Sequence, residues 1–477
     1  MLGLFGTLNL ASQSLQAQMT GIEVTGQNLA NVNTPGYSRQ VVQISASPDI
    51  LTSIGPEGTG ANATSIEQVV SNLLNSQIQS QSSTSGYWNA QQSALQSAQD
   101  ALGEYLNGSS TSSTNSASST GSTDTTGTGL SAQLDNFFSA FSALSASNSE
   151  ANQQAVIGAA QTLAASFNNI DSQCGSLNSS LNSSLTTQVA SANQLLTNIA
   201  DLNQEIYTEQ SDGGTANDLL DEREQDLENL SQLTNITTSN SSNGSVNVTI
   251  GGQTLVSGFS VNDTLQTYNP GNGQLQVRTA TGGVDLTLTG GSIQGTIDAR
   301  DGTLATLQNN INTLASTLIT QVNGIQDSGY NSTGGTGNTF FTGSNASTIS
   351  VNPKLVNNPA LLQVSASPTT TGDTSLALQI SQLSTAAQSA LNNQTFDDSY
   401  DGTVADLGSA LSNANNEATN QTVVSTNLAT QRSNVSGVNI DQEMTNMMTY
   451  QQAYEASAQL VTTVNTMLTD TMDMKTS

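Results

Sequence analysis

The chain has no histidine and only one cysteine, and both shortages restrict its chemistry. Without imidazole there is no Ser-His-Asp or Cys-His catalysis and no histidine-ligated metal. The lone Cys174 excludes an intramolecular disulfide, and its place in an apolar helical pattern predicts a small buried side chain. We therefore expect no catalytic residue, no metal and no cofactor.

Charge is also scarce, since only 9% of the 477 residues are charged. Lys and Arg number 7 against 36 Asp and Glu, so the net charge is −29. Such a chain cannot neutralise phosphates, and an anionic membrane surface repels it. No apolar run approaches the roughly 18 residues that a bilayer crossing needs. We expect neither nucleic-acid binding nor membrane insertion.

The first 18 residues (MLGLFGTLNLASQSLQAQ) have no basic start and no continuous apolar core. This pattern is not that of a cleavable secretory signal. Taken alone, it favours a cytoplasmic protein.

Both ends of the chain carry apolar residues at alternating spacings of four and three, which predicts long helices over residues 4–32 and 440–472. The apolar members that we take as an axial seam are Leu8, Leu15, Ile22, Leu29, Ile440, Met444, Met447, Tyr454, Val461 and Leu468. Neither helix has a partner seam in its own half of the chain, so the two termini are expected to pack on each other, with the middle as an inserted excursion.

Such a stripe can be buried within one molecule or against neighbouring subunits. Second apolar stripes, with Phe5 and Met19 in the first helix, favour contact with more than one neighbour. Polar seam positions such as Thr25 and Gln451 either set the register or face solvent, and the pattern does not separate these alternatives.

The middle of the chain changes character several times. A Ser/Thr/Gly run at 108–129 predicts a flexible insertion. Helical patterns cover about 65–106, 130–233 and 292–326, and alternating short runs at 246–288 predict an antiparallel β region. The acidic stretch at 218–230 is best explained as the solvated face of an amphipathic helix, capped by Asn217 or Asp218 and with Arg223 paired to nearby carboxylates.

Two terminal stretches resemble a known family. Residues 28–40 (NLANVNTPGYSRQ) resemble the N-terminal signature of the axial proteins of the bacterial flagellum, which are the rod, hook and hook-associated proteins. Residues 436–474 are similar to their C-terminal helix. Internal stretches at 129–144, 217–233 and 290–318 are similar to the hook-associated member that joins hook and filament. The shared turn motif falls on Asn28, Asn31, Asn33, Pro35, Gly36 and Tyr37.

The resemblance implies a mainly α fold with inserted β structure. The N- and C-terminal helices would pair as a coiled coil, beside an elongated helical-bundle domain and a small outer antiparallel β domain. We expect a terminal axial domain at 1–64 plus 435–477. The helical domain would cover 65–235, 291–327 and 374–434, and the outer β-rich domain 236–290 and 328–373.

The resemblance also implies a function. The protein would be a structural subunit of the hook–filament junction, not an enzyme, and would self-associate in a tubular assembly. Its other partners would be the hook protein, the second junction protein and a cytoplasmic export chaperone on the C-terminal helix. Export would occur unfolded through the flagellar type III system, without a cleaved signal. The expected location therefore changes to the extracellular flagellum.

Two alternatives remain. A hook or rod protein has a much shorter helical middle, so the helices at 130–233 argue against it. A secreted Ser/Thr-rich adhesin would be expected to carry a cleavable signal and a surface anchor.

Overall fold

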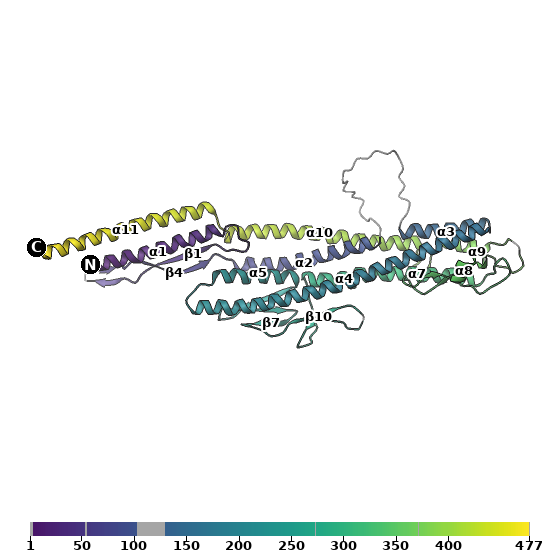
Figure 1. Cartoon of the computed structure of the whole chain (residues 1–477), viewed down its shortest axis with the longest axis horizontal. Coiled ribbons are helices and arrows are strands. Elements are labelled where there is room, and N and C mark those ends of the chain that lie inside the picture. The colour runs from purple at the N-terminus through teal and green to yellow at the C-terminus, as the bar shows by residue number, and fades with distance from the viewer. Residues whose placement is uncertain (1–2, 53–54, 103–128, 272, 371, 477) are drawn as a thin grey trace, which may run out of the picture.

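The protein is an elongated array of long helices with both termini at one end (Figure 1). The structure, a computed structural model, describes residues 3–52, 55–102, 129–271, 273–370 and 372–476. The predicted flexible insertion at 108–129 lies outside these ranges except for its last residue.

The described helices and strands follow the expected order of helical, β and helical segments. The α-helices are α1 (Leu4–Ala30), α2 (Asn72–Leu102), α3 (Leu130–Ala146), α4 (Glu150–Ser211), α5 (Asn217–Leu233), α6 (Gly291–Asp298), α7 (Ala305–Asp327), α8 (Pro353–Asn357), α9 (Ser375–Gln382), α10 (Phe396–Ser436) and α11 (Ile440–Thr476). The other helical turns are the π-helical η1 (Ala299–Leu304) and the 3-10 turns η2 (Pro359–Leu361) and η3 (Ser389–Leu391). The strands are β1 (Gln40–Ala46), β2 (Ile50–Thr52), β3 (Gly55–Glu57), β4 (Ala61–Gln68), β5 (Ile236–Asn240), β6 (Val246–Ile250), β7 (Gln253–Ser257), β8 (Ser260–Val261), β9 (Leu265–Tyr268), β10 (Gln276–Thr279), β11 (Phe341–Thr342) and β12 (Ser350–Val351).

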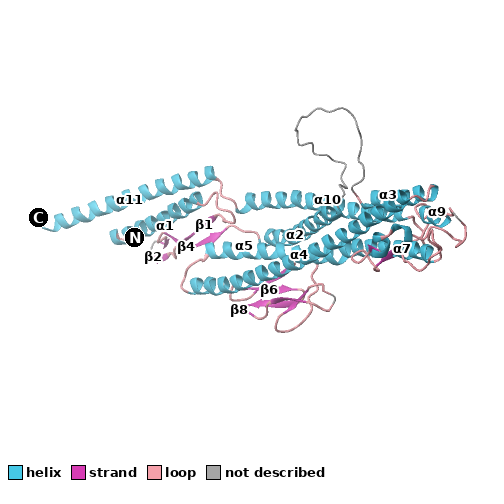
Figure 2. Ribbon diagram, turned by 45° about the vertical axis from the view of Figure 1, so that its right-hand side comes forward, coloured by secondary structure: helices cyan, strands magenta, loops and turns pink. Residues whose placement is uncertain are grey.

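The prediction of paired terminal helices is confirmed, because α1 packs against α11. The prediction that the second helix begins near residue 65 is wrong. Residues up to Gln68 belong to β4, which pairs antiparallel with β1 and forms a two-stranded ribbon beside α1 (Figure 2). Backbone pairing of Gln68 with Gln40 holds this segment extended, and α2 begins only at Asn72.

Helix α4 is the spine of the outer part, because its 62 residues give a length of about 90 Å. Ser149 begins it by accepting a hydrogen bond from the amide of Asn152 at 3.2 Å, and Glu150 places negative charge in the first turn. Its first half buries Phe167 and Cys174 in one core, and its second half buries Leu196 and Ile199 in another. Cys174 is thus a buried residue, as predicted, and burial raises the pKa of its thiol to about 11.

The core farthest from the termini is aromatic. Phe137 and Phe141 of α3 have ring centroids 5.1 Å apart, and Phe340 and Phe341 meet edge to face at 4.7 Å. These phenylalanines bury the segment that carries β11 and β12 inside the helical bundle. We predicted that residues 328–373 would join 236–290 in one outer β region, but the two segments lie in different cores.

The larger antiparallel sheet lies on the second half of α4. Its strand order is β5-β6-β7-β8, and β9 and β10 form a separate hairpin beside it. Alternate residues of β6, including Val248 and Ile250, are buried against the helix. In β7 the successive Leu255 and Val256 are both buried, next to a shift in the register of β6 and β7. The sheet therefore depends on α4 for its core.

Asp397, in the first turn of α10, gives a stability that changes with pH. Burial, reinforced by the nearby carboxylates of Asp135, Asp401 and Asp398, raises the pKa of Asp397 to about 6. The folded state therefore binds this proton more tightly than the unfolded state does. It follows that the contribution of Asp397 to stability is fully present below the ordinary pKa of an aspartate and is lost as pH rises through about 6.

We expect Asp397→Asn to stabilise the chain at pH 7 by on the order of 1 kcal/mol, because solvent screens this half-buried carboxyl, and to flatten the dependence on pH between about 4 and 6. Denaturant unfolding at several pH values measures both effects. Asp406→Asn, at an exposed position of the same helix, is the control and should change neither. A less stable Asp397→Asn protein at pH 7 would contradict the assignment.

Candidate assembly site

Helices α1 and α11 run antiparallel and touch along one line. Three pairs lie across it, namely Ser14 with Ser457, Gly21 with Tyr450 and Asn28 with Glu443. The members are seven residues apart on both helices, which is the repeat of a coiled coil. The pair therefore has one defined register, in which the two residue numbers of each contact sum to about 471.

The middle contact is a close approach of an aromatic ring to a helix backbone. A Cβ atom at Gly21 would lie 2.8 Å from ring carbons of Tyr450, closer than atoms in contact approach. Gly21 is buried, so only a hydrogen in place of a side chain leaves space for the ring. The glycine thus serves the contact between the helices, although it weakens α1 itself.

Asn28 joins α1, the following turn, β1 and α11. Its side chain is 0% exposed. The amide nitrogen donates to the carbonyl of Gln40 at 2.8 Å and to Oε2 of Glu443 at 3.0 Å. The amide oxygen accepts from the backbone N–H of Gln40 and from the hydroxyl of Tyr37, both at 2.9 Å. If the amide were rotated by 180°, its oxygen would face two acceptors and its nitrogen would face two donors. The hydrogen bonds therefore fix the orientation of the Asn28 amide group.

The predicted axial seam lies beside the contact line and not on it. Seam residues follow the contact positions by one residue in α1 and mostly by four in α11, which corresponds to rotations of about 100° and 50° around the helix. In an antiparallel pair, these rotations turn both helices toward the same flank. We call this flank the axial face, and it comprises Leu8, Leu15, Ile22, Leu29, Ile440, Met444, Met447, Tyr454, Val461 and Leu468.

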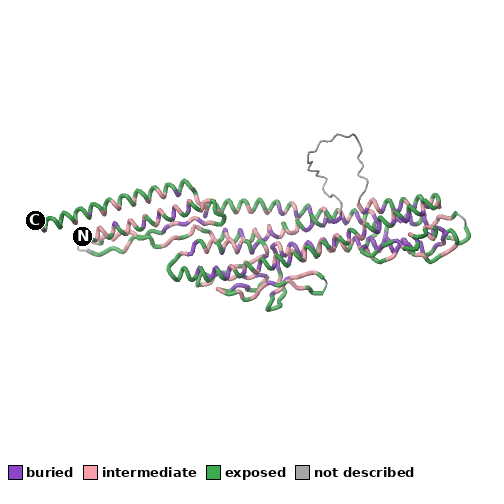
Figure 3. Tube along the Cα trace, in the orientation of Figure 1, coloured by how far each residue is buried: buried purple, intermediate pink, exposed green. Residues whose placement is uncertain are grey.

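The exposure of these residues fits this geometry. Half-buried members are Leu8, Leu15, Ile22, Leu29, Met447, Val461 and Leu468, and exposed members are Ile440, Met444 and Tyr454. Figure 3 shows α11 exposed over most of its surface, in contrast to the buried helices of the bundle. Of the polar seam positions, Thr25 is buried and bonded to the carbonyl of Gly21, whereas Gln451 is exposed. The polar contacts between the two helices come instead from Ser14 with Ser457 and from Asn28 with Glu443.

The family turn motif ends α1 and starts β1. Asn31 follows the last residue of α1 and donates from its side chain to the carbonyl of Gln27 at 3.1 Å. Gly36 has φ +82°, a left-handed conformation that favours glycine. The hydroxyl of Tyr37 donates a hydrogen bond to Asn28, so the last residue of the motif is tied to the first. Asn33 and Pro35 are exposed.

The start of α5 fastens the terminal pair to the outer helices, and we call this contact the joint. Asp221 accepts from the backbone N–H of Ser38 at 2.8 Å, and Asp218 accepts from the side chain of Gln40 at 3.1 Å. Asn217 donates from its side chain to a carbonyl of β4 at 3.0 Å. The turn, β1 and β4 are thus all held by one turn of helix.

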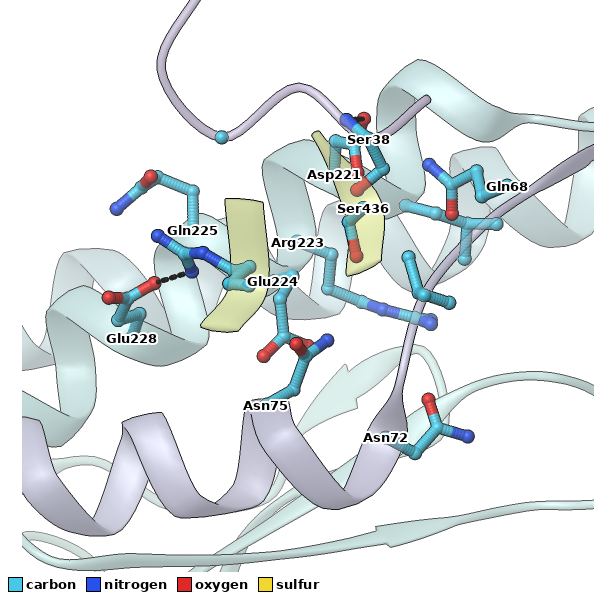
Figure 4. A pocket seen from close by; sticks show the side chains of 14 residues that line it. Ser38, Gln68, Asn72, Asn75, Asp221, Arg223, Glu224, Gln225, Glu228 and Ser436 are labelled. Atoms are coloured by element: carbon cyan, nitrogen blue, oxygen red, sulfur yellow. Dashed lines mark hydrogen bonds and ion pairs between the residues drawn. The ribbon is translucent and has the colours of Figure 1, made fainter. Parts of the chain in front are cut away.

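The joint is polar and contains a cavity of about 230 Å³ (Figure 4). Burial raises the pKa of Asp221, partly offset by the hydrogen bonds from Ser38. Burial also raises the pKa of Glu224, which accepts from Gln79 at 2.9 Å. On the far side of the cavity, Glu228 and Arg432 form an ion pair at 2.7 Å that fastens the end of α10.

The interpretation of residues 218–230 as a solvated face is therefore wrong for the first turns of α5. The carboxylates meet the terminal part, and Arg223 is buried and donates to Asn203 at 2.9 Å rather than to an acid. The residue before the helix is Ala216 in a left-handed conformation, so no side chain caps it. The sequence signal for the joint is weak, because acidic residues at helical spacing are common on solvated surfaces.

No group of three or more His, Cys, Asp or Glu side chains within the described residues is arranged to hold a metal ion. None of the described helices combines the length and apolar character needed to cross a membrane.

Comparison with protein families identifies both ends of the chain. Residues 8–37 match the family "Flagella basal body rod protein", and residues 429–474 match "Flagellar basal body rod FlgEFG protein C-terminal". These are the segments that form α1 with its turn, and α11. Both ends of the chain are thus similar to axial proteins of the bacterial flagellum.

The part of the chain between the terminal helices is similar to one particular kind of flagellar axial protein. Residues 121–341 match "Flagellar hook-associated protein FlgK helical domain". Flagellar hook-associated protein 1 of Bacillus subtilis is 24% identical, with 96% of each chain covered. The same protein of Salmonella typhimurium is 23% identical over 96% of this chain and 98% of its own. Over almost its whole length the chain is therefore similar to flagellar hook-associated protein 1 (FlgK), a structural protein of the hook–filament junction.

A solved structure shows the shared fold. The flagellar hook junction protein FlgK from Burkholderia pseudomallei superposes with a TM-score of 0.64 at 17% identity. It covers 76% of this chain and 100% of that one.

Proposed function

We propose that the axial face is the surface through which this chain joins neighbouring subunits of the flagellar tube at the hook–filament junction. The observation that carries the proposal is the position of the apolar repeat. Ser14, Gly21 and Asn28 line the contact within the pair, so most of the apolar residues of the seam lie on its flank. Burying that flank against other subunits supplies hydrophobic stabilisation that the single chain lacks.

The partners that follow are further copies of this chain, the hook protein and the second junction protein. The family supports assembly into the axial structure. The joint supports a mechanical function, because it fixes the terminal pair to the outer helices through several hydrogen bonds at once. Under this proposal the chain is an extracellular adaptor without catalytic activity, and the turn motif is the link between its axial and outer parts.

We also propose export in the unfolded state without a cleaved signal, with a cytoplasmic chaperone on α11. Helix α11 packs mainly on α1 and exposes several methionines, including Met444 and Met448. Flexible methionine side chains adapt to more than one partner surface. One apolar face can thus serve the chaperone first and the tube later.

For the domains, we propose one change to the expected division. The axial part remains 1–64 plus 435–477, and residues 236–290 remain the outer β part. Residues 328–373 join the helical part, because their phenylalanines belong to its core.

The double substitution Met447→Asp with Val461→Asp tests the axial face. We expect at least a tenfold loss of chain incorporated into junctions and of chaperone co-eluting with the purified protein, because two carboxylates on the apolar flank resist desolvation. The control is Thr445→Asp with Thr466→Asp, at exposed positions that the heptad repeat places on the back of α11. Normal junctions and filaments with the first variant would disprove the function of this face.

A further inference from the structure

The terminal pair has a second apolar surface on the flank opposite the axial face. The ribbon of β1 and β4 packs there, since a Cβ atom at Gly60 would lie 3.3–3.4 Å from the side chains of Gln13 and Leu10 of α1. Leu10 follows the contact line by three residues, which rotates it away from Leu8 and Leu15. On α11, the equivalent positions are Leu460 and Met467.

The tip of the ribbon, formed by β2 and β3, extends this surface. It lies near the free end of the terminal pair, beside the start of α1 (Figure 2). Leu51 of β2 is 85% exposed and neighbours the exposed Ile50. Leu460 and Met467 are exposed as well. We call these four residues the ribbon face.

The charge distribution indicates what can cover the ribbon face. Copies of a chain with a net charge of −29 repel one another, so close contacts are favoured where the surface is uncharged. Residues 50–56 carry no charge, and the nearest carboxylates, Asp49 and Glu57, lie at the base of the tip. Residues 456–469 around Leu460 and Met467 carry no charge either. The axial face draws on the same uncharged part of α11, through Val461 and Leu468.

We infer that the ribbon face of one copy receives the axial face of a second copy of this chain. A contact repeated around a tube is heterologous, and so needs two different patches that complement each other on each subunit. The axial face supplies one patch, and the ribbon face supplies the other on the opposite flank. This inference rests on the proposed function, and it assigns an assembly function to the β2–β3 tip, which the helical repeats alone do not reveal.

The test uses Leu51→Asp and the double substitution Leu460→Asp with Met467→Asp, produced in a strain whose own copy is deleted. We expect each to reduce junction-bound chain at least tenfold while the free protein keeps its unfolding midpoint, because Leu51 is almost fully exposed. Leu73→Asp is the matched control, since Leu73 is 72% exposed at the start of α2, away from both faces. It should assemble normally.

A cross-link identifies the occupant. One tagged version carries Met467→Cys, and a second carries Ile440→Cys, Met444→Cys or Tyr454→Cys in turn, which samples about 20 Å of the axial face. Oxidation of assembled junctions should join the two versions, whereas a version with Val423→Cys on α10 should remain separate. The native Cys174 is buried and does not interfere.

The failures are distinguishable. If the axial-face variant Met447→Asp/Val461→Asp forms normal junctions, the proposed function is wrong. If that variant loses the junction but all ribbon-face variants keep it and no cross-link forms, then only the pairing of these two faces is wrong.

Discussion

Replacing Asn28 with alanine is expected to release α11 from α1 more completely than any other single change. The substitution removes four hydrogen bonds and leaves the buried Glu443 carboxylate and both backbone groups of Gln40 without this partner. Removing a buried side chain that forms several hydrogen bonds lowers the free energy of unfolding by about 3–5 kcal/mol. Amide hydrogen exchange in α1 and α11 should accelerate at least a hundredfold, and junction assembly should fail.

Asn31→Ala is the control for this prediction. Asn31 is of the same residue type and lies three residues away, but its side chain makes only exposed hydrogen bonds, to the carbonyl of Gln27 and from the hydroxyl of Thr34, and none to α11. We expect about 1 kcal/mol or less from its loss, because its hydrogen bonds are exposed and water can replace them. Equal exchange rates in the two variants would show that Asn28 does not hold the pair together.

Two glycines of α1 should respond in opposite directions to the same substitution. Gly21→Ala places a methyl group 2.8 Å from the ring of Tyr450, and overpacking of this kind costs about 1–3 kcal/mol. Gly26→Ala meets nothing within 4 Å and should stabilise the helix by about 0.5–1 kcal/mol. Hydrogen exchange in α1 measures both changes on one scale.

The variant Tyr450→Ala separates this contact from a general effect on the helix. In that background the methyl group at position 21 has room, so Gly21→Ala should add no penalty. The difference between the two backgrounds is the coupling energy of the contact. A Gly21→Ala penalty of the same size with and without the ring would contradict the proposed contact.

These predictions share one physical basis. The line of contact between α1 and α11 carries several small or polar residues, namely Ser14, Ser457, Gly21, Asn28 and Glu443, beside the ring of Tyr450 and the buried Val464. Polar groups at such positions specify register at a cost in stability. Most of the larger apolar side chains of the seam lie on the flanks, where, under the proposed function, they stabilise an assembly of many chains.

The sequence alone determined the features that depend on local periodicity and composition. The apolar repeats near Leu15 and Val461 defined two long terminal helices. The absence of histidine and the single Cys174 limited the chemistry, while the residues around Asn28 and Gly36 carried the family resemblance. These are properties of single segments, so they can be read without knowing what lies opposite.

Only the tertiary structure decided which face of each helix contacts which other element of the fold. A heptad pattern marks an apolar stripe, but the rotation of α1 about its own axis depends on the close contact of Gly21 with Tyr450. Likewise, Asp221 looks like part of a solvated face until the turn at Ser38 is placed against it. Phe340 belongs to the helical core because it packs against Phe137 and Phe141 of α3. These partners lie about 200 residues away in the chain, so no local pattern predicts the contact. Contacts of this range come from packing, which no local pattern of residues records.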